Sequence, residues 1–134
     1  MRAAAALSLL AGLGACTNSN DRIPTYQPAR GSNEVLRGPI EAAPGHELVV
    51  GDLVMPAGGT IPRHYHHGEE FLYVIGGSAV VSRPGVPDVT LEPGQGLRIP
   101  PGTVHWGRAG PEGVRAISSW VATDGKPLRE PVAE

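Results

Sequence analysis

The sequence predicts an all-β fold in a single domain, and three observations favour it. The chain has 134 residues, of which 40% are hydrophobic, and this suits one core. Its 19 glycines and 14 prolines stand singly between short runs rich in Val, Ile and Leu, where they act as turn signals. From residue 47 onward, no window of about eleven or more residues keeps the apolar period of a helix. These patterns are typical of a sandwich or barrel.

Each predicted strand is a short run with β-branched residues, closed by Gly or Pro. The runs are residues 47–55, 69–76, 78–84, 88–93, 96–100, 103–108 and 114–122. So many closely spaced strands imply sheets that close on themselves and hide their edges. We assign the barrel to residues 41–126 and a C-terminal tail to residues 127–134. Aromatic residues are scarce, so we expect an aliphatic core with Phe71, Tyr73, Trp106 and Trp120 as its large members.

The N-terminal segment has the pattern of an export signal. A positive start is followed by an apolar run at residues 3–13, which is too short to span a bilayer. Residues 13–16 (LGAC) resemble the bacterial lipoprotein processing box, so we expect a signal peptide at residues 1–15 and lipidation of Cys16. Simple cleavage and an Ala-rich helix are the alternatives. The mature protein would lie on the periplasmic side of the cell envelope, touching the membrane only through its lipid anchor.

Residues 16–40 are expected to form a flexible tether between the anchor and the barrel, since the polar part after Cys16 carries two prolines and has no period. Cys16 is the single cysteine, which excludes an internal disulfide. The net charge of −2 gives no electrostatic case for nucleic acid as a partner.

Residues 63–70 (RHYHHGEE) hold three of the five histidines in the chain. Because side chains alternate along a strand, His64 and His66 should share one face, and Glu70 can return to it. Two imidazoles and a carboxylate make half of a metal site, which His105 on another strand could complete. Alone, however, a His-x-His pair is more often a surface pair, and His105 could be a buried histidine bonded to a carbonyl.

The other histidines and the second glutamate have simpler interpretations. His46 follows Pro44 and Gly45 in a predicted turn, and His67 has the opposite parity, so each should be solvated or lie behind the ligands. Glu69 should face solvent or hydrogen-bond to a ligand histidine.

The wider spacing resembles the cupin superfamily. The first cupin motif, G-x5-H-x-H-x3-E-x6-G, is matched from Gly58 through Gly77. The second, G-x5-P-x-G-x2-H-x3-N, is matched at Gly94, Pro100, Gly102 and His105 and departs only at Ala109. Asn at that last position is not a ligand in the family, so the departure does not affect a metal site.

This resemblance implies a jelly-roll barrel in a small exported protein. It also implies a possible homodimer, because dimers are frequent among such proteins. It implies one divalent transition metal ion held by three histidines and one glutamate, which are His64, His66, Glu70 and His105. Nitrogen and oxygen donors suit Fe, Mn, Ni, Co, Cu or Zn, and the sequence does not choose among them. The motif glycines are expected to close turns with positive φ; they are Gly58, Gly77, Gly94 and Gly102.

Three functions remain open for a small-molecule ligand or substrate, and the sequence does not decide whether the protein is an enzyme. The first is a metal-dependent oxidoreductase of dioxygenase type, whose open metal positions take O2 and substrate. The second is a non-catalytic metal-binding or ligand-binding module. The third is a metal-assisted isomerase or decarboxylase, which is weaker because no acid–base partner stands out beyond His67 and Glu69. Ser118 and Ser119 have no evident base for nucleophilic catalysis.

Overall fold

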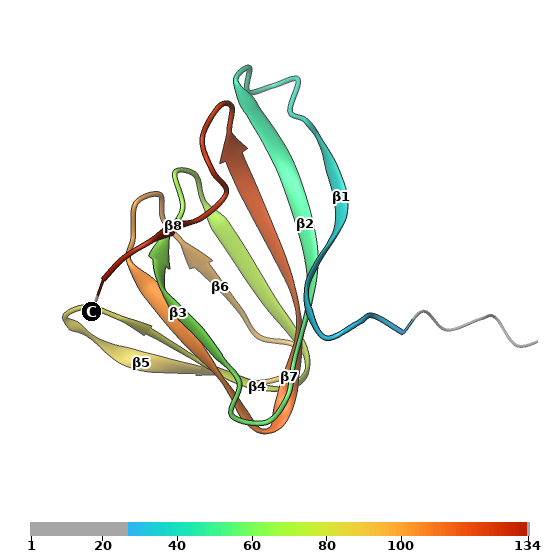
Figure 1. Ribbon diagram of the computed structural model, residues 1–134, viewed down its shortest axis with the longest axis vertical. Helices are drawn as coiled ribbons and strands as arrows, with labels where there is room; N and C mark the ends of the chain where they lie inside the picture. Colours follow the sequence, from blue (N-terminus) through green and yellow to red (C-terminus); the bar gives the residue numbers. More distant parts are fainter. Residues whose placement is uncertain (1–26, 134) are drawn as a thin grey trace, which may run out of the picture.

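The computed structural model describes residues 27–133, and these form a β-barrel that is open on one side (Figure 1). Eight strands and no helix occur in this range, so the all-β prediction is confirmed. No helix there could cross a membrane. The strands are β1 Gly31–Pro39, β2 His46–Met55, β3 Thr60–Tyr65, β4 Glu70–Arg83, β5 Val86–Leu91, β6 Gly96–Ile99, β7 His105–Thr123 and β8 Glu130–Pro131.

The long strand β7 holds the barrel together. Its first residues pair with β3, and its second half pairs with β2. β4 pairs with β7 over both halves and carries β5 and β6 on its other side. All of these pairs are antiparallel. Because β7 pairs with β2, β3 and β4, this one strand joins the two walls of the barrel, of which one contains β2 and the other contains β3. The sequence predicted two strands at residues 103–108 and 114–122, whereas residues 105–123 form the single strand β7.

The core lies between the two walls and is mainly aliphatic. Buried side chains of β4, such as Leu72 and Val74, pack against Ala116 of β7 and Ile99 of β6. Trp120 is buried as expected, and Trp106 is half-buried.

Two of the predicted core aromatics are instead on the outside. Phe71 and Tyr73 are 44% and 51% exposed, because they alternate along β4 with the buried Leu72 and Val74. The expectation that they belong to the core was therefore wrong. Both faces of β4 carry large apolar residues, so composition alone could not tell the inner face from the outer one.

The structure places residues 31–39 in strand β1, although the sequence predicted that they belong to a flexible tether. This segment pairs with β2 along its length, but most of its side chains are exposed. It is held by backbone hydrogen bonds, so it lacks the apolar alternation that reveals other strands. In the tail, β8 pairs with β3 through His64 and Tyr65. Residues 1–26, which include Cys16 and the predicted signal, lie outside the described residues.

Two glycines permit close approaches that shape the barrel. Gly77 has φ of +67°, and a Cβ atom there would overlap the carbonyl oxygen of Gly113 on β7. Gly68, between β3 and β4, lies so close to the Val121 carbonyl that no side chain fits. The motif glycines Gly58, Gly94 and Gly102 also have positive φ.

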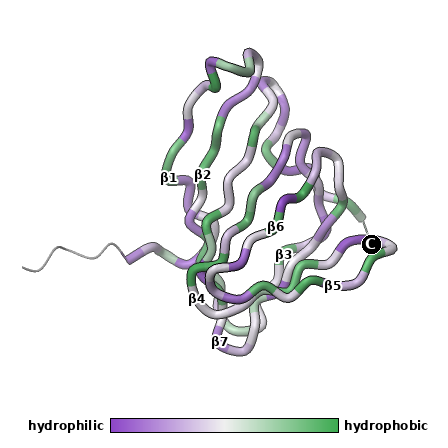
Figure 2. The backbone as a smooth tube through the Cα atoms, turned by 180° about the vertical axis from the view of Figure 1, so that it is seen from behind, coloured by the Kyte–Doolittle hydropathy of each residue, from purple (hydrophilic) through white to green (hydrophobic). Residues whose placement is uncertain are grey.

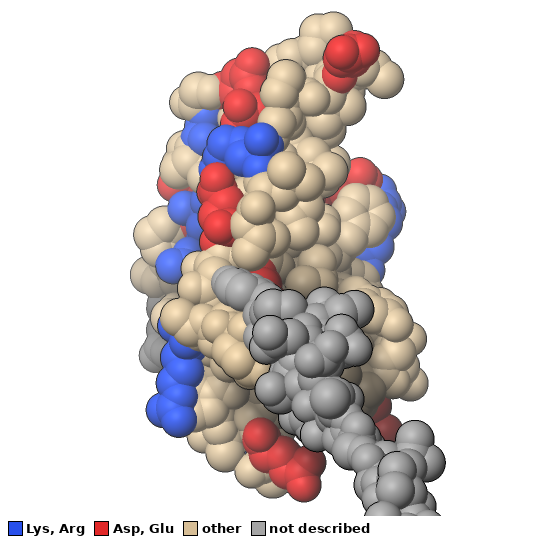
Figure 3. Space-filling model, turned by 90° about the vertical axis from the view of Figure 1, so that its right-hand side faces the viewer, with Lys and Arg blue, Asp and Glu red and all other residues tan. Residues whose placement is uncertain are grey.

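The surface shows no extended field of one sign on the face drawn in Figure 3, where basic and acidic side chains are interspersed. This agrees with the net charge of −2 and gives no electrostatic support for a polyanionic partner.

Candidate metal centre

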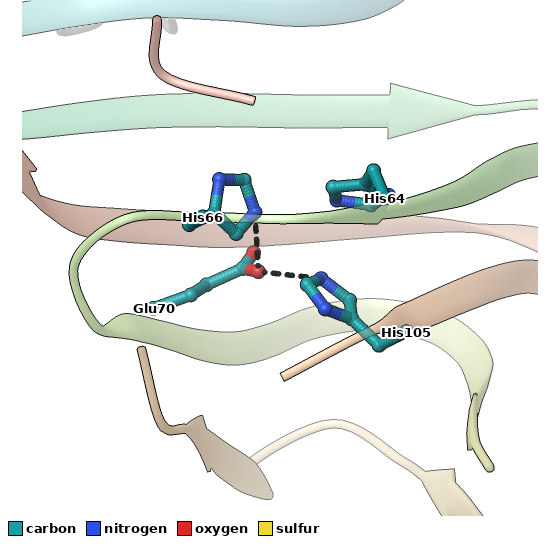
Figure 4. Close-up of side chains that lie close together, drawn as sticks. All are labelled: His64, His66, Glu70 and His105. Carbon is teal, nitrogen blue, oxygen red and sulfur yellow. Dashed lines mark hydrogen bonds and ion pairs between the residues drawn. The ribbon is translucent and has the colours of Figure 1, made fainter. Parts of the chain in front are cut away.

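Four buried side chains from separate parts of the barrel converge on one point (Figure 4). His64 comes from β3, His66 from the segment just after it, and Glu70 and His105 are the first residues of β4 and β7. One ligand atom from each residue lies within 4.8 Å of all the others. The four side chains are between 4% and 7% exposed.

The local fold explains this convergence. His64 is the direct cross-strand partner of His105, so their rings meet with centroids 4.2 Å apart. His66 points to the same side as His64, whereas Tyr65 and His67 pack against each other with ring centroids 5.5 Å apart. The tight passage at Gly68 then turns the chain so that Glu70 begins β4 facing the histidines.

Each of the three histidines is oriented by a backbone carbonyl. Nδ1 of His64 lies 2.7 Å from the Pro62 oxygen, and Nδ1 of His105 lies 2.9 Å from the Thr103 oxygen. Nδ1 of His66 lies 2.5 Å from the Leu128 oxygen. A carbonyl oxygen only accepts, so each Nδ1 must donate its hydrogen. The neutral form of each ring therefore presents the lone pair of Nε2 to the centre, which is the form that binds a metal.

Glu70 supplies the negative charge. Its Oε2 atom lies 3.1 Å from Nε2 of both His66 and His105. Burial alone would raise the pKa of Glu70, but His105 and His66, which carry a positive charge and a hydrogen on Nε2 when their rings are protonated, outweigh burial and lower the pKa from 4.5 to about 2. The carboxylate is therefore ionised at neutral pH.

His64 is held in its neutral form. Burial removes water from the ring and lowers its pKa from 6.5 to about 4, although the hydrogen bond to Pro62 works in the opposite direction. The neighbouring histidines lower the pKa further. This ring is thus a ready ligand at neutral pH, because no proton has to leave it first.

The donor set fits a divalent transition metal. Three Nε2 lone pairs and one carboxylate oxygen point at the same small space, and only protons or a cation can hold such electron-rich atoms together. One carboxylate against a divalent ion leaves the centre about +1 and Lewis acidic. The four residues could therefore hold one ion, with positions left for other ligands in a six-coordinate geometry.

The sequence carries the signature of a known family over the same region. The cupin domain family profile matches residues 51–120, which is just over half of the chain and includes all four donors. The chain belongs to the cupin family. The family resemblance seen in the motif spacing is thereby confirmed.

One curated relative of this cupin is D-lyxose ketol-isomerase from Cohnella laeviribosi, with 38% identity over 86 residues. The match covers 50% of this chain and 47% of the relative, so the chain spans about half the length of that protein.

Solved structures support the fold. A cupin-like protein from Thermotoga maritima matches with a TM-score of 0.60 and 28% identity, covering 65% of each chain. DMSP lyase DddQ from Ruegeria pomeroyi matches with a TM-score of 0.58 and 29% identity, covering 65% of this cupin and 45% of the lyase. Oxalate decarboxylase from Bacillus subtilis shares the fold at 19% identity, with a TM-score of 0.59, over 66% of this chain and 24% of that chain.

The donors lie on the wall of a cavity in the cupin barrel, whose volume is about 840 Å³. Leu72, Ile99 and Ala116 are among the apolar residues of its wall. Among the described lining residues, the donors are the only Asp, Glu, His, Lys, Tyr or Cys. The other ionisable lining residues are Arg30, Arg108 and Arg129.

Other polar residues of the motif region do not join the donors. Nε2 of His67 pairs with Glu130 at 3.0 Å, and Glu69 forms an ion pair with Arg98 at the surface. His67 therefore lies behind the ligand face, as its parity predicted, and Glu69 bonds to no ligand histidine. His46 begins β2 and is not among the residues lining the cavity.

The sequence reading did not assign two groups that act on the ligands. The Leu128 carbonyl orients His66, and no side-chain pattern could reveal a backbone acceptor 62 residues away. The indole Nε1 of Trp120 donates a hydrogen bond to Nε2 of His66 at 3.2 Å. Trp120 lies two residues after the buried Ser118 on β7, so both side chains point inward. This alternation was the signal that could have identified Trp120.

Proposed function

We propose that this cupin is a metal-dependent oxidoreductase of dioxygenase type that acts on a small organic molecule with oxygen donor atoms. The observation that carries the proposal is the placement of all four donors on the wall of an apolar cavity of about 840 Å³. Within the described lining, no second acid–base group accompanies them. Chemistry in this cavity would therefore be centred on the metal ion.

A ferrous or similar ion bound here would supply Lewis acidity and the means to activate O2. The protein's own contribution is positioning. Carbonyls fix the three imidazole rings, Glu70 stays ionised, and the four donor side chains are buried. A substrate with two oxygen atoms suits the two positions that four protein ligands leave open in octahedral geometry.

The test begins with metal analysis of untagged protein, followed by oxygen-electrode assays on phenolic, thiol and diketone compounds with Fe(II). Oxygen uptake that disappears in His64→Ala and persists in His67→Ala supports the proposal. Uptake that survives in His64→Ala would contradict it. Bound metal with tight ligand retention and no turnover would instead establish the binding module.

A metal-assisted isomerase is the second candidate, favoured by the 38% identity to D-lyxose ketol-isomerase. Proton transfer between neighbouring carbons requires a base, and the described cavity offers only the donor residues themselves. An aldose–ketose assay with Mn(II) separates the two candidates. Sugar interconversion without oxygen uptake would replace the oxidoreductase by the isomerase.

We also propose that two copies associate through the outer face of β2, β7 and β4. Its apolar outer side chains include Leu48, Phe71, Tyr73 and Ile75, which are 38–51% exposed. Figure 2 traces the backbone of the barrel from behind, coloured by hydropathy. Strands that are apolar on both faces are typical of sheets covered on both sides.

A second copy fits this face because its charges are already paired. Arg115 pairs with the buried Asp52, and Arg98 pairs with Glu69, so two such faces would not repel each other. Light scattering should give a dimer for the parent and a monomer for Tyr73→Glu. Val86→Glu, which changes an exposed apolar residue on β5, should remain dimeric. A monomeric parent at high concentration would overturn this proposal.

For the N-terminus, we propose export to the periplasmic side and lipidation of Cys16, supported by the apolar run and the LGAC box. The test is incorporation of labelled palmitate into the full chain in a bacterial host. Label in the parent but not in Cys16→Ser is the expected result. An unlabelled, soluble parent in the periplasm would show simple cleavage.

A further inference from the structure

Trp120 competes with a metal ion for one lone pair, and this competition suggests a role in ligand binding. The indole N–H is a donor only and lies 3.2 Å from Nε2 of His66. Because Nδ1 of His66 donates to the Leu128 carbonyl, Nε2 of the neutral ring is the acceptor for this hydrogen. It is also the atom that a metal ion would bind.

The indole has little freedom to leave. Trp120 is 8% exposed, and its backbone is paired with Val49 of β2 and Glu70 of β4. Its ring lies across Gly51, where an added Cβ atom would be 3.0 Å from Cζ3 and 3.1 Å from Cη2. A metal ion on His66 would therefore take the acceptor away, while the N–H stays in place beside the centre.

A buried N–H without a partner is costly, so the freed donor needs another acceptor. Trp120 lines the same cavity as the four donors. An oxygen atom of a molecule bound in this cavity beside the donors could be that acceptor. An anionic oxygen would gain most, because hydrogen bonds to charged acceptors are stronger.

We propose that Trp120 is a substrate-binding residue. In the metal-free protein its indole N–H donates a hydrogen bond to Nε2 of His66, and in the metal-loaded protein it donates to an anionic oxygen of a chelating substrate. The substrate class is a small molecule with a carboxylate, enolate or catecholate oxygen. This inference rests on the proposed metal centre and adds a residue outside the donor set.

The first experiment compares the parent with Trp120→Phe, which keeps an aromatic ring and removes the N–H. Co(II) binding is followed by visible absorption, and oxalate is then titrated into each Co(II)-loaded protein. We expect Trp120→Phe to bind Co(II) at least as tightly, because the competing donor is gone, and to bind oxalate about tenfold more weakly. Trp106→Phe is the matched control and should match the parent in both titrations.

Equal oxalate affinity in the parent and Trp120→Phe, at equal Co(II) occupancy, would overturn the inference and leave the metal centre intact. A parent that binds no Co(II) would overturn the metal centre itself, and the inference with it.

A second measurement leaves Trp120 unchanged and so does not depend on the folding of Trp120→Phe. The chain has two tryptophans, so Trp106→Phe leaves Trp120 as the single indole emitter. Saturation with Zn(II), which does not quench by redox chemistry, should shift the Trp120 emission, and oxalate should shift it again. Zn(II) binding without any change in emission would contradict the exchange of hydrogen-bond partners.

Discussion

His64 and His105 are direct partners across the β3–β7 ladder, and their ring centroids lie 4.2 Å apart. The two rings reach the centre from facing strands of one antiparallel pair, whose register fixes their separation. His66 joins them from the segment that links β3 to β4, and Glu70 from the first position of β4. The strand register therefore fixes the separation of His64 and His105 within the donor set.

Replacement of His105 by alanine should weaken metal binding by more than about 100-fold, because it removes one of four ligands, whereas the loss of outer partners alone costs 10–100-fold. The matched control is His67→Ala, since His67 pairs with Glu130 outside the donor set. Isothermal titration with Zn(II) would measure both affinities. Equal affinities in the two variants would place the ion elsewhere.

Zinc should raise the melting temperature of the metal-free protein. At free Zn(II) of about 100 times Kd, the free energy of unfolding rises by about 2.7 kcal/mol, which corresponds to a shift on the order of 10 °C in a domain of this size. Glu70→Gln removes the negative ligand and should lose most of the shift. Glu69→Gln, which alters the adjacent surface carboxylate paired with Arg98, should keep it. A full shift in Glu70→Gln, measured by calorimetry, would exclude Glu70 as a ligand.

Acid should destabilise the metal-free protein in two steps. Burial lowers the pKa of His64 from 6.5 to about 4, so between these values the unfolded chain binds a proton that the folded chain does not. Stability therefore falls as the pH drops from about 6.5 to 4, by on the order of 3 kcal/mol. Glu70 has a folded pKa of about 2 against 4.5 unfolded, so a further loss follows as the pH falls from about 4.5 to 2.

Urea unfolding of EDTA-treated protein at pH 7, 5.5 and 4 would measure the first step. His64→Gln should show a flatter pH dependence across that window, because the titrating ring is gone. The same slope in parent and variant would contradict the assignment to His64.

Two glycine substitutions should differ in cost. Gly94 has φ of +87° with open space around a Cβ atom, so Gly94→Ala should cost about 1 kcal/mol from backbone conformation alone. Gly77→Ala should cost clearly more, because its Cβ atom would also overlap the Gly113 carbonyl. Equilibrium urea unfolding compares them, and equal losses would show that β7 moves aside freely.

The motif spacing was sufficient to predict the fold and to name four residues that the structure brings together, because alternation along a strand fixes which side chains share a face. His64 and His66 follow from parity, and the fixed distance to His105 came from the family resemblance. Strand β1 could not be predicted in this way, since backbone pairing leaves no apolar pattern in exposed residues. Phe71 and Tyr73 were misassigned for the opposite reason, because β4 is apolar on both of its faces.

The carbonyl that orients His66 belongs to Leu128, beyond the last residue of β7. The ligand set spans residues 64–105, but its geometry is complete only after the segment leading into β8 has docked on β3. During synthesis this segment leaves the ribosome after every donor residue. Tight ion capture would then be a late event in maturation, and a nascent chain halted before Leu128 would have all four donors and yet lack the acceptor that selects the competent tautomer of one of them.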